Sequence, residues 1–405
     1  MLRSEGAVIL MNEDKIRYLV GSKDIEVAPR EPFSETVCNF FDDLAKELQK
    51  CDKAKLYPDI LTFAFWIRKA NISRLKEQMT VKQTRIGRGL VFHIAPSNVP
   101  INFAYSLAFG MLAGNVNIVR IPSKELPQVE IVCQCINQVL KEKYQELEDQ
   151  LFIVKYEADK EITDFFSSIC NARIIWGGDN AINEIRKSSL MPRSVEINFA
   201  DRYSFGIINP ETVLKVEDIE IKKLAVDFYN DTYLMDQNAC STPHMLFWKK
   251  TPGVTIEEAG VRLWKAVYEV AKEKYNLEGI KVSDKFTELY EYMAVRDNIR
   301  GFKKYDNYLY VLTLDNIEGA LEDYRGKYGL FYEYEFENYD EIACLVNEKI
   351  QTCACFGIER KEIIHMVMNN RLKGIDRIVP FGKTLNIDLI WDGYDVIGNL
   401  SRIIG

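Results

Sequence analysis

The sequence predicts an α/β fold made of two doubly wound domains. With 405 residues, the chain exceeds the length at which a single hydrophobic core stops growing. Hydrophobic residues make up 47% of it, which is enough for two large cores. Short, unbroken apolar runs alternate with segments of helical period. This alternation is expected for parallel strands that are buried on both faces and joined by helices.

Two helices are expected before the first central strand. Ser34 precedes apolar residues at helical spacing and is expected to cap the first of these helices. The second helix is expected over residues 59–78. Its inward-facing residues are expected to be Phe63, Ile67, Ala70 and Leu75.

The most informative stretch is a strand–helix–strand unit at residues 89–124. An apolar run, a helix that Asn102 can cap, the turn-forming pair Gly114-Asn115 and a second apolar run follow one another. The expected strands are 90–95 and 116–121, and the expected helix is 103–113. A crossover of this kind makes the two strands parallel neighbours.

The loop at residues 96–102, after the first of these strands, is expected to meet a ligand. Pro96 and Pro100 bracket a tight turn, and Asn98 lies inside it. Because the loop follows a parallel strand, it lies at the carboxyl end of the sheet, where open α/β sheets bind ligands. Asn98 is therefore a candidate site residue.

Further strands and helices extend this doubly wound sheet. The expected strands are 151–156 and 173–176, with helices over 161–170 and from about 181. Gly177-Gly178 follows the second strand and could contact a phosphate, although an ordinary turn fits this pair equally well. No G-x-G-x-x-G lies between a strand and a helix, so a dinucleotide must be held differently from the usual fingerprint.

A second α/β region follows a pause in the pattern near Asn209. Its expected helices are 220–233, 257–275, 284–294 and 359–372. We expect a nucleotide-binding domain over 1–209, a catalytic domain over 210–380 and a C-terminal return segment over 381–405.

One cysteine in this second region stands apart from the others. Cys240 lies in MDQNACSTPHMLFW, residues 235–248, between an amide-rich stretch and an apolar strand. A thiol on such a loop is exposed and is a candidate nucleophile. Most cysteines are not nucleophiles, so position alone does not decide the role of Cys240.

The charge balance argues against a nucleic-acid-binding protein. The net charge is −8, from 60 acidic and 52 basic residues, and no basic run is long enough for a DNA-binding groove. Small anions such as phosphates could still bind locally. No stretch approaches the ~18 apolar residues of a membrane helix. The apolar run at residues 7–11 is too short for a signal peptide.

The nine scattered cysteines indicate a reducing compartment, so we expect a cytoplasmic protein. Cys133 and Cys135 lie on an expected helix, where residues two apart diverge and cannot share a metal ion. Cys353 and Cys355 lie in a strand-like run, and the three histidines are far apart in sequence. Core packing is the expected role of both pairs, and we expect no bound metal.

The order of these motifs resembles the aldehyde dehydrogenase superfamily. Matching segments are Pro96-Ser97-Asn98-Val99-Pro100, Ala113-Gly114-Asn115, Arg120-Ile121-Pro122-Ser123, Gly177-Gly178-Asp179, Glu196-Ile197-Asn198-Phe199 and Asp236-Gln237-Asn238-Ala239-Cys240. Arg120 stands where that superfamily has Lys, and the segment of Glu196 keeps only the glutamate. The superfamily's E-x-F-G-P ribose segment has no clear counterpart, so we assign no ribose ligand.

The chain is more similar still to the LuxC-type acyl-CoA reductases, the reductase component of bacterial fatty-acid reductase. Two stretches bear this likeness: DQNACSTP at residues 236–243, and GIDRIVPFG at 374–382 followed by WDGY at 391–394. The resemblance implies two α/β domains with the active site between them. It also implies reduction of a long-chain acyl-CoA, or of an acyl-protein thioester, to the fatty aldehyde.

The resemblance assigns the catalytic roles as follows. Cys240 attacks the thioester and holds the acyl group, and the amide of Asn98 and the backbone N–H of Cys240 stabilise the oxyanion. Glu196 shuttles the thiol proton or, alternatively, is a plain strand-surface carboxylate. For His244 we favour a structural role over that of a base, because Pro243 intervenes and no acidic residue follows closely to orient the ring.

The expected cofactor is NADPH, with NADH as the alternative. Arg120 ends the second strand of the strand–helix–strand unit, where a guanidinium suits a 2′-phosphate. Ser123, Gly177 and Gly178 are expected to bind the cofactor as well. The substrate partner is acyl-CoA, and the resemblance adds an acyl-protein synthetase and a homo-oligomer as expected partners. A non-acylating aldehyde dehydrogenase and a nicotinamide-independent acyltransferase or thioesterase are the competing functions.

Overall fold

The computed structural model describes residues 15–22, 25–79 and 83–405. The apolar run at 7–11 lies outside them. The chain divides into two compact units: Met1–Ala200 with Asp388–Gly405, and Asp201–Ile387. The nucleotide-binding and catalytic functions expected for the two halves stay predictions. Within the described ranges, no helix has the length and apolar character needed to cross a membrane.

The first unit contains a six-stranded sheet whose order runs β1-β5-β4-β3-β6-β7. These strands are β1 (Arg17–Val20), β5 (Leu151–Lys155), β4 (Val116–Ile121), β3 (Leu90–Ile94), β6 (Ala172–Trp176) and β7 (Val195–Phe199). All neighbours pair in parallel except β1, which is antiparallel to β5. The parallel pairing predicted for the strands at 90–95 and 116–121 is confirmed.

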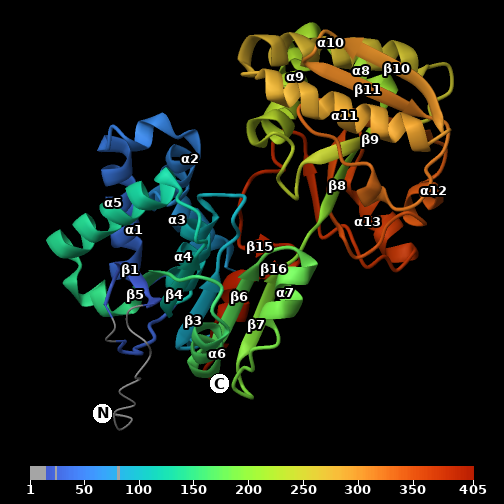
Figure 1. Cartoon of the computed structure of the whole chain (residues 1–405). Coiled ribbons are helices and arrows are strands. Elements are labelled where there is room, and N and C mark those ends of the chain that lie inside the picture. Colours follow the sequence, from blue (N-terminus) through green and yellow to red (C-terminus); the bar gives the residue numbers. More distant parts are fainter. Residues whose placement is uncertain (1–14, 23–24, 80–82) are drawn as a thin grey trace. The chain divides into compact units, whose positions relative to one another are not determined.

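Helices cover both faces of this sheet (Figure 1). They are α1 (Glu35–Lys50), α2 (Pro58–Trp66), α3 (Lys69–Gln78), α4 (Asn102–Leu112), α5 (Pro127–Lys143), α6 (Lys160–Ile169) and α7 (Asp179–Ile185). Two 3-10 turns, η2 (Ala54–Leu56) and η3 (Gln145–Gln150), accompany them. The helices α4 and α5 pack on one face, and α6 and α7 pack on the other. The strand order reverses between β3 and β6, and open α/β sheets bind ligands outside the carboxyl ends of their strands at such a point.

The single helix expected over residues 59–78 is wrong, because the chain breaks it into α2 and α3. Arg68 is extended, with φ −63° and ψ 148°, and Asp42 accepts the first amide of α3, that of Lys69, at 2.9 Å. Ala70 is exposed rather than inward, whereas Phe63 and Leu75 are buried as expected. The apolar spacing continues across the break, so periodicity alone does not reveal it.

Two expected helix caps also differ from the structure. Ser34 occupies the N-cap position of α1, but its hydroxyl makes no capping bond. Asn102 is not a cap, because Ile101 is the N-cap of α4 and Asn102 is already helical. The amide of Asn102 is bonded to the carbonyl of Val99 at 3.1 Å, so the turn begins before it.

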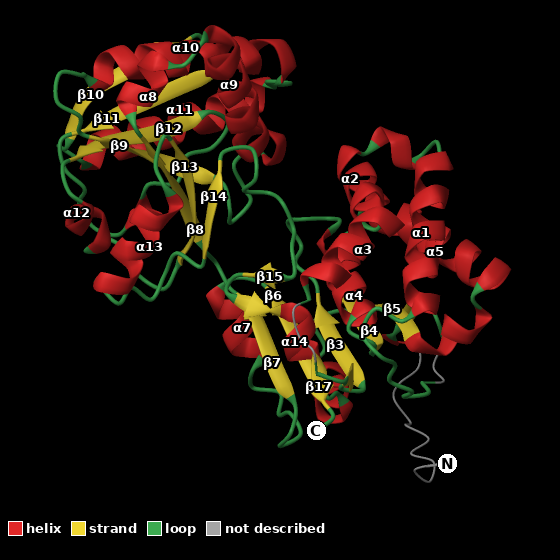
Figure 2. Cartoon of the chain, turned by 180° about the vertical axis from the view of Figure 1, so that it is seen from behind, coloured by secondary structure: helices red, strands yellow, loops and turns green. Residues whose placement is uncertain are grey.

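The C-terminal segment belongs to the first unit. It contains the pair β15 (Ile390–Trp391) and β16 (Tyr394–Asp395), then α14 (Val396–Leu400) and β17 (Ser401–Ile403). The last strand pairs antiparallel with β2 (Arg85–Gly87), and Asn115 donates its amide to the carbonyl of Leu400 at 2.9 Å. Figure 2 labels α14 and β17, the last two elements of the chain.

The second unit contains a seven-stranded sheet of order β10-β11-β12-β9-β8-β13-β14. Its strands are β8 (Tyr203–Ile208), β9 (Pro243–Lys249), β10 (Ile299–Tyr305), β11 (Leu309–Leu314), β12 (Leu330–Phe336), β13 (Ile350–Phe356) and β14 (Arg377–Pro380). The edge strand β10 is antiparallel to β11, and every other pair is parallel. The predicted mixed α/β architecture with parallel sheets is therefore confirmed.

Two apolar cores fill the faces of the second sheet. The helices are α8 (Pro210–Lys215), α9 (Asp218–Thr232), α10 (Ile256–Lys274), α11 (Gly279–Val295), α12 (Tyr339–Ala343) and α13 (Arg360–Asn369). The first three pack on one face and the last three on the other. The pause expected near Asn209 is wrong, because Asn209 caps α8 by accepting the amides of Glu211 and Thr212 at 2.9 and 3.4 Å.

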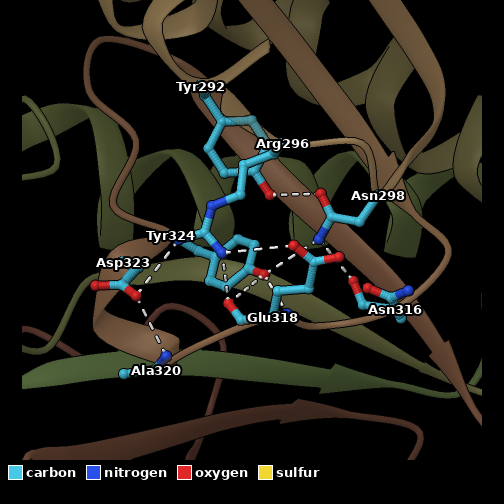
Figure 3. A network of polar contacts seen from close by, with 8 residues as sticks. All are labelled: Tyr292, Arg296, Asn298, Asn316, Glu318, Ala320, Asp323 and Tyr324. Atoms are coloured by element: carbon cyan, nitrogen blue, oxygen red, sulfur yellow. Dashed lines mark hydrogen bonds and ion pairs between the residues drawn. The ribbon is translucent and has the colours of Figure 1, made fainter. Parts of the chain in front are cut away.

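A polar network ties the loop that follows β11 to the end of α11 and to Asn298, which directly precedes β10 (Figure 3). Tyr292 donates to Asn298 at 3.1 Å, and Asn298 donates to the hydroxyl of Tyr324 at 3.2 Å. Tyr324 and Arg296 both donate to the carbonyl of Glu318, at 2.9 and 2.8 Å. Because its buried members are hydrogen-bonded to one another, the network orders this loop; none of these residues is a predicted site residue.

Candidate functional site

Five of the seven predicted site residues gather at the carboxyl edge of the first sheet. They lie on or directly after three of its strands: Asn98 after β3, Arg120 and Ser123 at β4, and Gly177 and Gly178 after β6. Glu196 lies in β7, and Cys240 lies in the second unit.

The loop of Asn98 is held close to the sheet at both ends. Ala95 donates its amide to the carbonyl of Arg120 at 3.0 Å, which extends the pairing of β3 with β4 by one residue. The turn that ends at Asn102 closes the other side. Between these two points the side chain of Asn98 is exposed. An amide in this position can donate a hydrogen bond to a ligand oxygen.

The packing of the protein itself does not require glycine at positions 177 and 178, because a side chain would have room at both. A Cβ added at Gly178 would have no protein atom within 4 Å, and at Gly177 the nearest atom would be the Cβ of Ala181 at 3.5 Å. Gly114 differs, because its φ is +85° and a Cβ there would lie 2.1 Å from the carbonyl oxygen of Arg30. The turn after β6 therefore leaves room for a ligand to approach its backbone.

Arg120 offers a donor that the protein leaves unused. Its guanidinium carbon lies 4.7 Å from the centroid of the Tyr156 ring, and its Nε is buried without a hydrogen-bond partner among the described residues. Buried donors without a partner are rare, and a bound anion would satisfy this one. Ser123 lies two residues beyond the strand and is half-buried. Arg120 and Ser123 therefore fit a phosphate group of a dinucleotide.

A chain of hydrogen bonds fixes Trp176, the last residue of β6. Asn117 donates to the carbonyl of Asn115 at 2.7 Å, so its Oδ1, 3.0 Å from Nε2 of His93, accepts from that ring. Nδ1 of His93 then accepts from the hydroxyl of Ser106 at 2.8 Å, and Ser106 accepts the indole N–H of Trp176 at 2.9 Å. Burial lowers the pKa of His93 to about 4, so the ring is neutral and each bond keeps one direction.

Aromatic rings surround the indole of Trp176. Phe199, its partner on β7, stacks on it with ring centroids 3.7 Å apart, and Trp391 meets it edge-on at 5.2 Å. Tyr394 also packs against Phe199, at 5.8 Å. The C-terminal hairpin therefore contributes part of the surface at the carboxyl end of β6 and β7.

Glu196 is held by two arginines near the amino end of β7. Arg173, opposite it on β6 and 2% exposed, donates Nε to Glu196 at 2.8 Å and donates its NH2 to the same oxygen. Arg186 pairs with the other oxygen at 3.0 Å. Asn198, two residues closer to the carboxyl edge, donates to Glu196 at 2.9 Å, and its own Oδ1 is buried without a partner among the described residues.

Cys240 lies on the turn between α9 and β9, and its side chain is partly exposed. The hydroxyl of Ser204, at the start of the neighbouring strand β8, donates to the carbonyl of Cys240 at 2.7 Å. Thr242 donates its hydroxyl to the carbonyl of Asp231 at 3.0 Å. The chain is therefore anchored at Cys240 and directly after it.

Asp231 links this turn to the segment after β14. Its carboxylate accepts the amides of Gly382 and Thr384 at 2.6 and 3.1 Å, while its carbonyl holds Thr242. Burial raises the pKa of Asp231 to about 6, although the hydrogen bonds from Gly382 and Thr384 by themselves lower this pKa. The motif around Gly382 therefore packs beside the helix that leads into the cysteine turn.

His244 is part of the core, as we favoured from the sequence. It is 4% exposed, its Nδ1 lies 3.1 Å from the carbonyl of Gly326, and its ring stacks on Tyr203 at 5.3 Å. Burial lowers its pKa to about 3. A neutral ring enclosed in this way does not serve the thiol as a base.

The sequence did not point to Ser204, Trp176 or Arg173. Arg173 offered the clearest signal, because it is a charge inside an otherwise apolar strand, where only a paired ion is tolerated. Ser204 and Trp176 offered none, since their partners lie 36 and 70 residues away in sequence.

Comparisons with known proteins bear on the family and the fold. A model of the family described as acyl-CoA reductase (LuxC) matches residues 22–294, more than half of the chain. A search among curated proteins finds no match.

Solved structures show the same fold. An oxidoreductase from Marinobacter aquaeolei has a TM-score of 0.64 at 11% identity, over 95% of this chain and 88% of that chain. An indole-3-acetaldehyde dehydrogenase complexed with NAD+ gives 0.64 at 10% identity, over 91% and 83%. A glyceraldehyde-3-phosphate dehydrogenase from Methanocaldococcus jannaschii complexed with NADP gives 0.59 at 15% identity, over 91% and 88%. At such identities, the likeness establishes the fold.

Proposed function

Because this chain belongs to the LuxC family of acyl-CoA reductases, we propose that it reduces a fatty acyl-CoA to the aldehyde through an acyl-enzyme on Cys240. It is an oxidoreductase with the aldehyde dehydrogenase fold. The observation that supports the proposal most is the turn before β9, where a partly exposed thiol is anchored inside the matched region.

Cys240 divides the reaction into two steps. Its sulfur attacks the thioester carbonyl, the oxyanion collapses, and CoA leaves as a thiol after taking up a proton. A reduced nicotinamide, when bound, supplies the hydride for the second step. Cys240 then leaves the thiohemiacetal carbon as the aldehyde forms, and its sulfur recovers a proton.

Asn98 and the backbone N–H of Cys240 are the proposed oxyanion donors. The exposed amide of Asn98 stands at the carboxyl edge of the first sheet, where ligands of such sheets bind. An oxyanion forms in both steps, so the same donors serve twice. One such donor is typically worth ~3 kcal/mol in the transition state.

Arg120, Ser123, Gly177 and Gly178 are the residues that we propose to hold the cofactor. The buried, unused Nε of Arg120 and the open space beside Gly178 support a phosphorylated ligand at this edge. A guanidinium at the end of β4 favours the 2′-phosphate of NADPH over the bare ribose of NADH.

The catalytic role of Glu196 stays a prediction, and its surroundings favour the alternative. Arg173 and Arg186 already hold its carboxylate. We propose that its main contribution is to join β6, β7 and α7.

Steady-state assays test the proposed function directly. NADPH oxidation should follow the addition of acyl-CoA, rise with the fitting chain length, and disappear in Cys240→Ala. Turnover of free aldehyde with NADP+ and no CoA would instead indicate a non-acylating dehydrogenase. CoA release without NADPH oxidation would indicate an acyltransferase or a thioesterase. If only an acyl-protein supports reduction, the donor is a partner protein.

A further inference from the structure

The turn before Cys240 contains two consecutive residues in the left-handed region. Asp236 has φ 51° and Gln237 has φ 63°. Side chains rarely adopt this conformation, and a glutamine has no local bond of the kind that helps aspartate there. Such residues persist only where the surroundings hold them, so the contacts of this pair decide where the next three residues lie.

Asp236 is held from two helices. Tyr275, the C-cap residue of α10, donates its hydroxyl to Oδ1, and Lys281 of α11 donates its Nζ to the same oxygen at 3.0 Å. Lys281 is 18% exposed and lies 5.1 Å from the centroid of the Tyr275 ring. We call these three residues the Asp236 clamp.

Gln237 is held by the start of β12. Its Oε1 accepts the amide of Gly329 at 2.6 Å and its Nε2 donates to the carbonyl of Leu330 at 3.0 Å, while the side chain is 3% exposed. Lys285, one turn beyond Lys281 on α11, is itself bonded to the carbonyl of Tyr328 at 2.7 Å. Asp236 therefore differs from Gln237. Gln237 is held by buried hydrogen bonds to the backbone, whereas one contact of Asp236 is a partly exposed ion pair with Lys281.

We propose that Lys281, acting through Asp236, is a positioning residue for the nucleophile Cys240. This proposal rests on the proposed function. The anchors at Ser204 and Thr242 act at and after Cys240, whereas the clamp and the hydrogen bonds of Gln237 hold the residues before it. Without the ammonium group, Asp236 keeps the hydrogen bond from Tyr275 but loses its ion pair. Its left-handed conformation is then less constrained, and the thiol spends less time in the geometry that acylation needs.

A second trio in the same unit provides a matched control. Lys249 donates to Glu362 at 2.6 Å, Tyr339 donates to the same oxygen at 3.2 Å, and the ammonium lies 5.2 Å from the tyrosine ring. Like the Asp236 clamp, this trio consists of a lysine, a carboxylate and a tyrosine. Lys249 is the last residue of β9, whereas Cys240 precedes the start of that strand. Lys249→Met therefore removes a comparable ion pair away from the thiol.

Two measurements on Lys281→Met and Lys249→Met test the proposal. Hydrogen exchange at the amides of residues 238–241 reports the clamp without any substrate, and should be about tenfold faster in Lys281→Met only. The rate at which acyl-CoA acylates Cys240, divided by the rate at which iodoacetamide alkylates it, should fall about tenfold or more in the same variant. Lys281→Arg should restore both quantities to within about threefold.

Distinct outcomes separate this proposal from the proposed function. If wild-type Cys240 is alkylated but never acylated, the proposed function fails, while hydrogen exchange still reports the clamp. If exchange and the rate ratio in Lys281→Met equal those in Lys249→Met, Lys281 does not position the thiol. Should Lys281→Met not fold, Tyr275→Phe keeps the ring and removes one hydrogen bond, and the same comparison applies with about a threefold effect.

Discussion

Replacing Glu196 with glutamine should destabilise the first unit more than it slows chemistry. The guanidinium of Arg173 is 2% exposed. Apart from Glu196, its partners among the described residues are neutral oxygens, those of Ser167 at 2.9 Å, Ser188 at 2.8 Å and Ile185 at 3.3 Å. Breaking one side of a buried ion pair typically costs about 3–5 kcal/mol. Because Glu196 is 14% exposed, we expect the lower end, about 3 kcal/mol.

Thermal and urea unfolding measure this loss. For a domain of about 200 residues, about 3 kcal/mol corresponds to a fall in Tm of roughly 6–12 °C. Arg186→Ala is the control, because Arg186 is 57% exposed and its pair with Glu196 should contribute at most about 1 kcal/mol. In single-turnover mixing of acylated Glu196→Gln with NADPH, the hydride step should survive. If Glu196→Gln keeps wild-type stability but loses acylation, the structural role is refuted. Glu196 would then act in proton transfer, as the sequence predicted.

Three further outcomes are expected. Arg120→Ala should raise KM for NADPH much more than for NADH, and equal losses with the two cofactors would show that Arg120 does not bind the 2′-phosphate. Asn98→Ala should slow both acylation and hydride transfer by about a hundredfold or more in single-turnover assays, and a normal rate in either step would contradict its oxyanion role. Burial lowers the pKa of His93 from 6.5 to about 4, so the unfolded state binds protons first. The contribution of His93 to the free energy of unfolding should therefore fall by about 3 kcal/mol between pH 6.5 and 4. In urea unfolding, His93→Gln should reduce the pH slope by this amount, while the slope due to His244, whose pKa burial lowers to about 3, should remain.

Much of the fold follows from local patterns. The strand–helix–strand unit was predictable because its apolar runs, turn residues and helical period all favour the same structure. The break between α2 and α3 was not, because it depends on Asp42, 27 residues before the amide that it binds. Ser34 and Asn102 show the same limit, since the sequence places polar residues at helix starts without showing which atoms they reach.

The site was predictable as far as it lies on loops after strands. Asn98, Gly177 and Gly178 were expected at the carboxyl edge of a parallel sheet, and they lie there. The partners of Glu196 and the left-handed pair before Cys240 were not expected. Both depend on contacts between segments that only the folded chain brings together, such as Lys281 with Asp236, 45 residues apart.

The central claim is that Cys240 carries the acyl group, and one mass measurement tests it most directly. The protein is incubated with acyl-CoA in the absence of cofactor, digested, and searched for the acyl mass on the peptide that contains Cys240. The account predicts an adduct on that peptide that disappears when NADPH is added and aldehyde forms. An adduct that is absent there, together with a Cys240→Ala variant that still reduces acyl-CoA, would contradict it.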